Sequence, residues 1–211
     1  MSDTTIDTAA PPADRLTPLL FAVAIFTSAS LVFVVQPMVT KLVLPMLGGS
    51  PSVWNTAMVF FQAALLAGYG YAHAVQKIGS IKLQVTVHLV LLTCAALFLP
   101  LHINGWLGDP DPAAPIGWLL GTLALSVGAP FAILSATAPL LQAWFARVRA
   151  GHADGKNPYV LYAASNLGSF LALLSYPVLI EPLSTPSGQR LGWSGGYAVF
   201  MILIALLAFV V

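Results

Sequence analysis

The few charged residues of the chain are separated by long runs of apolar residues. No Asp, Glu, Lys or Arg lies inside six intervals, which run from Arg15 to Lys41, Lys41 to Lys77, Lys82 to Asp109, Asp111 to Arg147, Lys156 to Glu181, and Arg190 to the end. Each interval exceeds the ~20 residues that a helix needs to cross the hydrocarbon core of a bilayer. The pattern therefore predicts six membrane-spanning helices, at residues 17–36, 52–75, 83–103, 117–146, 159–181 and 193–211.

Composition favours the same fold class. Of the 211 residues, 58% are hydrophobic and 7% are charged, whereas a soluble domain carries roughly 25% charged residues. A spanning segment must satisfy its backbone hydrogen bonds internally, and the alternating ~10-residue segments of a membrane β-barrel are absent. We therefore predict an all-α integral membrane protein in which residues 17–211 form one six-helix membrane domain.

The two ends of the chain differ from this body. Residues 1–16 are polar and acidic, contain paired prolines and lack the basic start of a signal peptide. We expect them to form a disordered cytoplasmic arm. The last residues, MILIALLAFVV, carry no basic anchor, and we expect the natural chain to continue beyond them.

Lysine and arginine are distributed unequally between the two sides of the predicted helices. With the N-terminus inside, the outer loops carry only Lys41 and Arg190, and the inner segments carry Arg15, Lys77, Lys82, Arg147, Arg149 and Lys156. Cytoplasmic segments are enriched in Lys and Arg, so both termini are predicted to be cytoplasmic. Lys77, Lys82, Arg147 and Arg149 form a basic inner rim that either sets topology or binds anionic lipid or an acidic partner.

Two predicted helices carry a polar stripe on an otherwise apolar surface. The stripe of segment 52–75 repeats about every two turns and consists of Asn55, Gln62, Tyr69 and His73. The stripe of segment 159–181 consists of Tyr162, Ser165, Asn166, Ser169 and Tyr176. Polar side chains carry a desolvation cost in lipid, so both stripes are expected to face protein or water. They either line a shared cavity or form interhelical hydrogen bonds.

Four prolines are expected to kink the helices, because proline lacks the backbone N–H donor and clashes with the preceding turn. They are Pro37, Pro130, Pro139 and Pro177. Segment 117–146 would measure ~45 Å as one straight helix, which exceeds the ~30 Å hydrocarbon core. We therefore expect this segment to be kinked and tilted.

Two charged residues lie close to span ends. Lys41 belongs either to an amphipathic interface helix or to a continuation of the first span past Pro37, with its ammonium reaching water or headgroups. Alternatively, Lys41 projects into the bundle as the counter-ion of an anionic group. Glu181 is the only carboxylate near a span. It either binds a cation or proton, or is an interfacial acid that accepts hydrogen bonds from loop backbone.

The chain lacks the residue patterns of catalysis and cofactor binding. Cys94 is the single cysteine, the histidines have no partners at metal-ligand spacing, and no glycine-rich loop joins a strand to a helix. We therefore predict no catalytic residue, cofactor, metal site or nucleic-acid partner.

Two long blocks carry a family resemblance. QPMVTKLVLPMLGGSPSVWNTAMVFFQAALLAGYGYAH and NPYVLYAASNLGSFLALLSYPVLIEP resemble the membrane region of the fused major-facilitator/spermidine-synthase family of bacterial membrane proteins. The resemblance covers residues 17–211 and implies a fold like one six-helix half of a major-facilitator transporter. It also implies a bacterial inner membrane and an adjoining soluble domain similar to polyamine aminopropyltransferases, which these 211 residues lack. The loop AHAVQKIGSIK has Gln76 where the major-facilitator pattern carries a carboxylate.

Three functions are compatible with these features. The first is a non-catalytic membrane module that anchors or scaffolds a partner protein or domain, with the lipid bilayer as its environment. The second is a transporter half that works as a homo-oligomer, or with a second membrane half, on a small polar solute. The third is an accessory subunit of a larger membrane complex.

Overall fold

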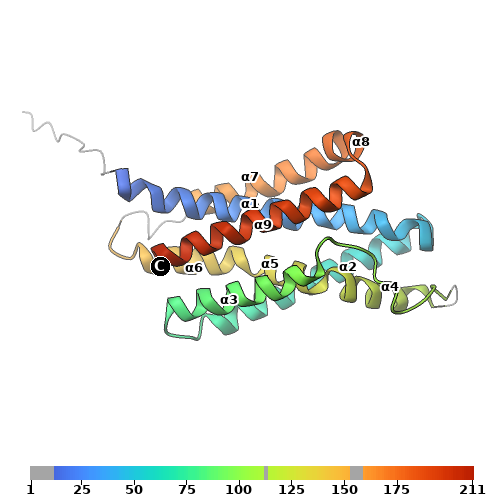
Figure 1. The fold of residues 1–211 in the computed structure, drawn as a ribbon, viewed down its shortest axis with the longest axis horizontal. Helices are drawn as coiled ribbons and strands as arrows, with labels where there is room; N and C mark the ends of the chain where they lie inside the picture. Colours follow the sequence, from blue (N-terminus) through green and yellow to red (C-terminus); the bar gives the residue numbers. More distant parts are fainter. Residues whose placement is uncertain (1–11, 112–113, 153–158) are drawn as a thin grey trace, which may run out of the picture.

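The computed structural model describes residues 12–111, 114–152 and 159–211, with side chains from residue 16 onward. The described part is helical and contains no strand (Figure 1). Six of its helical stretches are long and apolar enough to cross a membrane, which confirms the predicted all-α membrane fold. The spans are Leu16–Leu47, Pro51–Val75, Ile81–Phe98, Pro115–Val148, Tyr159–Leu183 and Pro186–Val210.

The first helix is longer than the sequence pattern predicts. Helix α1 (Pro12–Leu47) continues through Pro37, beyond the predicted end of the first span at residue 36. The residues after Pro37 are buried, with Met38 and Val39 each 2% exposed and Val43 fully buried. Burial of these side chains against the body offsets the hydrogen bond that Pro37 cannot make. The Lys41 segment is therefore a continuation of the first span and not a separate amphipathic interface helix.

The second and third spans form a helical hairpin. Helix α2 (Pro51–Val75) begins with a proline, whose missing N–H costs little in the first helical turn. Helix α3 (Ile81–Ala95) begins after Ser80, whose hydroxyl accepts a hydrogen bond from the backbone N–H of Leu83. The short 3₁₀ segment η1 (Ala96–Phe98) completes the third span.

The fourth span is divided into several helical segments. They are α4 (Pro115–Leu123), the π-helical turn η2 (Ala124–Gly128), α5 (Ala129–Ser135) and α6 (Thr137–Val148). The π-helical turn directly precedes the turn that contains Pro130, and the break at Ala136 precedes Pro139. A proline removes one backbone donor, and a widened turn redistributes the remaining hydrogen bonds.

The fifth span is interrupted in the same way, whereas the sixth is continuous. Helix α7 (Tyr159–Ser175) is followed by the π-helical turn η4 (Tyr176–Ile180), which contains Pro177, and by the short helix α8 (Glu181–Leu183). Helix α9 (Pro186–Val210) begins after Thr185, whose hydroxyl accepts a hydrogen bond from the N–H of Gly188 at 3.2 Å.

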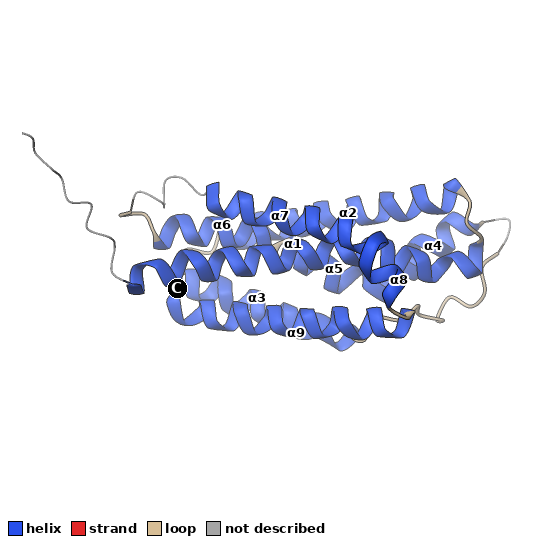
Figure 2. Ribbon diagram, turned by 90° about the horizontal axis from the view of Figure 1, so that it is seen from above, coloured by secondary structure: helices blue, strands red, loops and turns tan. Residues whose placement is uncertain are grey.

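Helix α1 lies centrally, and both α7 and α9 pack on it. Figure 2 shows α2 and α7 along one long edge of the body, α3 and α9 along the opposite edge, and α1, α5 and α6 between them. Large side chains fill the core, among them Phe21, Phe61, Phe131, Trp144, Tyr197 and Phe200.

Glycines allow two pairs of helices to approach closely. A Cβ on Gly168 of α7 would lie 2.6 Å from the Phe26 carbonyl oxygen of α1, and one on Gly68 of α2 would collide with the Ala132 carbonyl of α5. The Ser30 hydroxyl of α1 also donates to the Gly168 carbonyl at 3.3 Å. The small-residue edge of α7 therefore packs against the central helix.

Candidate functional site

One set of polar residues is buried where α2, α3 and α6 meet. His88 of α3 is fully buried and lies 3.3 Å from the Tyr71 hydroxyl and 3.1 Å from the Thr137 hydroxyl. One turn away, the Trp144 indole N–H donates to Oε1 of Gln84 at 2.7 Å, and the Gln84 amide donates to the Ile78 carbonyl at 2.5 Å. These five side chains, which we call the buried network, form two hydrogen-bonded groups that join three helices.

The polar stripe of α2 lies on the outside of the six-helix body. Asn55, Gln62 and His73 are exposed, and Tyr69 is 46% exposed. None of these four side chains has a hydrogen-bond partner among the described residues. The helix instead packs inward through a different face, which includes Ala57, Phe61 and Ala72.

The polar stripe of α7 is also directed outward in part. Asn166 is exposed and Tyr162 is 50% exposed, and neither has a hydrogen-bond partner in the described part of the chain. Ser165 and Ser169 are half-buried, and the Ser169 hydroxyl donates to the Ser165 carbonyl at 2.9 Å within the same helix.

The structure does not bring the two stripes together in an internal cavity. Helices α2 and α7 lie along the same edge of the body (Figure 2), and α1, α5 and α6 lie between this edge and the opposite one. We call the exposed polar residues of these two helices the open polar face; they are Asn55, Gln62, Tyr69, His73, Tyr162 and Asn166. These six residues make no interhelical hydrogen bond in the described part of the chain, whereas Tyr176 of the predicted stripe of segment 159–181 does make one.

The two charged residues near span ends form an ion pair. The Lys41 ammonium of α1 contacts Oε1 of Glu181 in α8, so Lys41 is the counter-ion of a carboxylate, but it lies at the surface and does not project into the bundle. The two side chains are 42% and 35% exposed. Sequence patterns placed each residue near a span end but could not pair them, because 140 residues separate them in the chain.

A second hydrogen-bonded pair lies beside this ion pair. The Tyr176 hydroxyl donates to Oε1 of Gln189 at 3.1 Å, and the Gln189 amide donates to the Ser184 carbonyl at 3.4 Å. Both residues are buried, at 7% exposure each. Tyr176 belongs to η4 and Gln189 to α9, so the bond joins the end of the fifth span to the start of the sixth. Gln189 was not singled out from the sequence, because it lies alone among small residues in PSGQRLG.

The predicted basic rim lies at one end of the body. Lys77 and Lys82 are exposed at the turn between α2 and α3, and Arg147 is exposed at the end of α6. The Arg147 guanidinium donates to the Gln76 carbonyl at 3.3 Å, which ties the two parts of the rim together. Arg149 differs from the other three because it is buried, at 8% exposure.

Metal ligands do not gather in the described part of the chain, where no three His, Cys, Asp or Glu residues come together. Cys94 is exposed on α3. Comparisons with protein-family models, with curated proteins and with solved structures found no match. The six apolar spans define an all-α, multi-pass membrane protein.

Proposed function

We propose that the chain is a non-catalytic six-helix membrane module that anchors or scaffolds a protein partner through the open polar face. The observation that carries this proposal is that the amides of Asn55, Gln62 and Asn166 are exposed at spanning helices without hydrogen-bond partners in the described structure. Transferring an amide from water to an apolar environment without a compensating hydrogen bond costs ~2–7 kcal/mol of free energy. Three such groups facing acyl chains would be costly, so a polar surface covers them.

The placement of the two stripes supports a single partner surface. Helices α2 and α7 lie on the same side of the body in Figure 2, and Figure 1 shows α1, α5 and α6 between them, so a partner that contacts both must extend across this whole side. Helix–helix contacts in membranes commonly use amide and hydroxyl groups as hydrogen-bonding partners. Exposed apolar side chains occur on both edges, such as Leu66 and Phe170 on α2 and α7 and Val90 and Ile202 on α3 and α9. The edges differ in their amides, because Gln84 of α3 and Gln189 of α9 are buried.

The family resemblance suggests what the partner is. Membrane regions of the fused major-facilitator/spermidine-synthase family adjoin a synthase-like domain, so a synthase-like protein or a second membrane half is the partner that the proposal favours. A bacterial inner membrane, with both termini in the cytoplasm, belongs to the same proposal. Lys77, Lys82 and Arg147 at one end of the body support that orientation.

Photocrosslinking in native membranes tests this function. A photoreactive benzoyl-phenylalanine is placed at Gln62 or Tyr162 of the open polar face, and at Val90 or Ile202 as matched exposed controls on α3 and α9. We expect a protein adduct of one defined mass from both face positions and only lipid adducts from the control positions. Mass spectrometry of the adduct then identifies the partner, which includes the case of a second copy. Equal protein labelling from all four positions would refute the proposal.

A transporter half is the second candidate, and the π-helical turns η2 and η4 favour it. Discontinuous helices line substrate sites in secondary transporters, and π-helical turns are frequent at functional sites. In this case the open polar face would line a solute path between two six-helix bodies. The test is uptake of spermidine and of uncharged polar solutes into vesicles that contain the parent or the Asn55→Leu, Asn166→Leu variant. Uptake that the double substitution leaves unchanged would exclude this candidate.

A further inference from the structure

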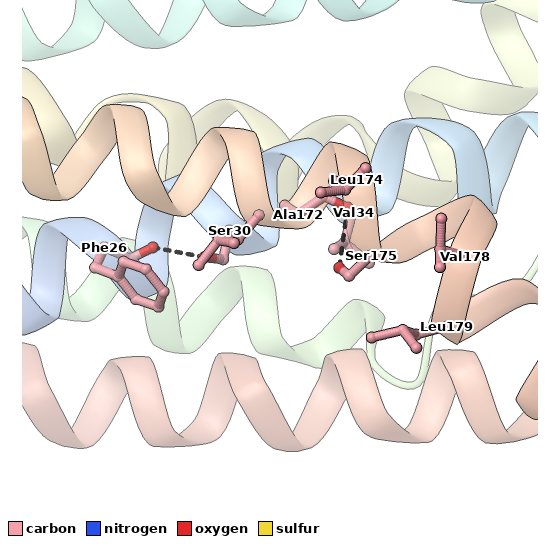
Figure 3. A pocket seen from close by; sticks show the side chains of 9 residues that line it. Phe26, Ser30, Val34, Ala172, Leu174, Ser175, Val178 and Leu179 are labelled. Atoms are coloured by element: carbon pink, nitrogen blue, oxygen red, sulfur yellow. Dashed lines mark hydrogen bonds between the residues drawn. The ribbon is translucent and has the colours of Figure 1, made fainter.

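An apolar groove runs along the body between α7 and α9, with α1 as its floor (Figure 3). It consists of two hollows of about 490 and 420 Å³ that share Ser30, Val34 and Leu179, so the two are continuous. Helices α7 and α9 each pack on α1 but make almost no contact with each other. Helix α7 contributes to both the groove and the open polar face, but none of the six residues of the open polar face lines either hollow.

The two hydroxyl groups in the middle of the groove already donate their protons to backbone carbonyls. The Ser30 hydroxyl donates to the Phe26 carbonyl at 2.9 Å, and the Ser175 hydroxyl donates to the Ala172 carbonyl at 3.2 Å, as the dashed lines in Figure 3 show. The remaining lining there is apolar and comes from Phe26, Val34, Leu171, Ala172, Leu174, Val178 and Leu179. Such a lining matches a hydrocarbon chain.

One end of the groove is polar. Ser184 and Gln189 line it there, next to the ion pair of Lys41 and Glu181. Lys41 lies two helical turns beyond Val34, so it continues the α1 face that forms the groove floor. An ammonium and a carboxylate, each more than one third exposed, stand at this end.

Glycines of α9 keep the groove open. Gly188 and Gly192 line it, and a Cβ added to Gly192 would meet no atom within 4 Å. The Trp193 indole N–H donates to the Leu31 carbonyl at 2.9 Å and holds α9 on α1 beside the groove. The two glycines therefore add no side chain that would fill the groove from the side of α9.

From this arrangement we propose that the groove binds one acyl chain of a zwitterionic phospholipid, phosphatidylethanolamine, with its headgroup at the Lys41–Glu181 end. The hollows fall within the ~300–1,000 Å³ of small-ligand pockets and are too small for a helix ~10–12 Å across. Apolar walls at spanning depth suit the chain. The phosphate pairs with Lys41, and the amine pairs with Glu181.

Photolabelling with a lipid tests the site directly. The full chain is reconstituted in vesicles of phosphatidylglycerol containing a small fraction of phosphatidylethanolamine with a diazirine in its acyl chain. Adducts are mapped for the parent, for Gly192→Leu and for the control Gly195→Leu, which has equally open space on the same helix but does not line the groove. Unlabelled phosphatidylethanolamine serves as the competitor.

The expected result is competable labelling of residues 171–193 in the parent and in Gly195→Leu. In Gly192→Leu this labelling falls about tenfold, because the new side chain displaces buried methylenes. Leu179→Trp fills the groove from the opposite wall and gives the same loss should Gly192→Leu fold poorly. Labelling of both groove variants at the parent level would overturn the proposal.

The headgroup position has its own readout. In the Lys41→Gln, Glu181→Gln variant, unlabelled phosphatidylethanolamine should compete no better than unlabelled phosphatidylglycerol. Labelling of the groove by the diazirine in the acyl chain should persist. A preference that survives this double substitution would overturn the placement of the headgroup. Neither result depends on the protein partner proposed above, because the residues substituted to disrupt binding belong to the groove and its polar end and none of them belongs to the open polar face.

Discussion

The buried network and the open polar face contain the same kinds of residue in opposite circumstances. Gln84 and His88 of the network are fully buried and hydrogen-bonded, whereas Gln62 and His73 of the open polar face are exposed and have no partner among the described residues. Polar groups in a membrane body are stable where they are satisfied. The first set is therefore structural, and the second set is the surface at which we propose that another molecule binds.

The largest difference in stability is expected between two substitutions of glutamine by leucine, one in the buried network and one in the open polar face. Gln84→Leu leaves the Trp144 N–H and the Ile78 carbonyl without these partners, and each unsatisfied buried group costs ~1–3 kcal/mol. We expect the free energy of unfolding of the purified body to fall by about 2–4 kcal/mol, measured by titration with sodium dodecyl sulfate. Gln62→Leu is the matched control and should change it by less than about 0.5 kcal/mol. Equal losses would show that the two regions do not differ.

Close packing can be separated from hydrogen bonding by changing glycines. Gly168→Ala places a Cβ 2.6 Å from the Phe26 carbonyl oxygen and must move α7 away from α1. Such overpacking costs about 1–3 kcal/mol. Gly195→Ala, which meets no atom within 4 Å, should be neutral or stabilise α9 by up to about 1 kcal/mol. The same unfolding titration distinguishes the two, and a Gly168→Ala protein as stable as the parent would contradict the close contact between α1 and α7.

The ion pair of Lys41 and Glu181 tests a case between the two regions, because both side chains are paired but partly exposed. A double-mutant cycle of Lys41→Met and Glu181→Gln isolates the interaction between these side chains. Because both are more than one third exposed, we expect a coupling of about 1 kcal/mol or less. A coupling of several kcal/mol would mean that water is excluded from this end of α1.

The smallest effect on the isolated body is expected for the open polar face itself. Asn55→Leu combined with Asn166→Leu removes two exposed amides that hold no other helix in the described structure. Unfolding of the purified body should shift by about 0.5 kcal/mol or less. A larger loss would assign these asparagines to the structure of the body.

Most of the fold could be predicted from the sequence, because the bilayer imposes a simple rule on length and charge. The intervals between charged residues predicted six spans, and prolines marked the interrupted fourth and fifth spans. The first helix was the exception. Local chemistry favours a break at Pro37, but burial of Met38, Val39 and Val43 keeps α1 continuous, and burial depends on residues distant in the chain.

The candidate sites were predictable only in part. Helical periodicity identified both polar stripes, but it could not tell an inward face from an outward one, since both orientations give the same spacing. The pairing of Lys41 with Glu181 and the buried network around His88 join residues of different helices, and no local pattern contains that information. The sequence likewise did not indicate that Gly192 lines the groove, because a residue without a side chain gives no polar or apolar signal there.

The central claim is that another molecule completes the open polar face, and the mass and composition of the native particle test it most directly. A tagged copy is extracted from its native membrane in mild detergent, and the parent is compared with the Asn55→Leu, Asn166→Leu variant. We expect the parent to purify as a stoichiometric complex heavier than its 22.2 kDa chain, with a second protein or a second copy, and the variant to purify as a single chain. A parent that is monomeric, or a variant that keeps the same complex, would contradict the claim.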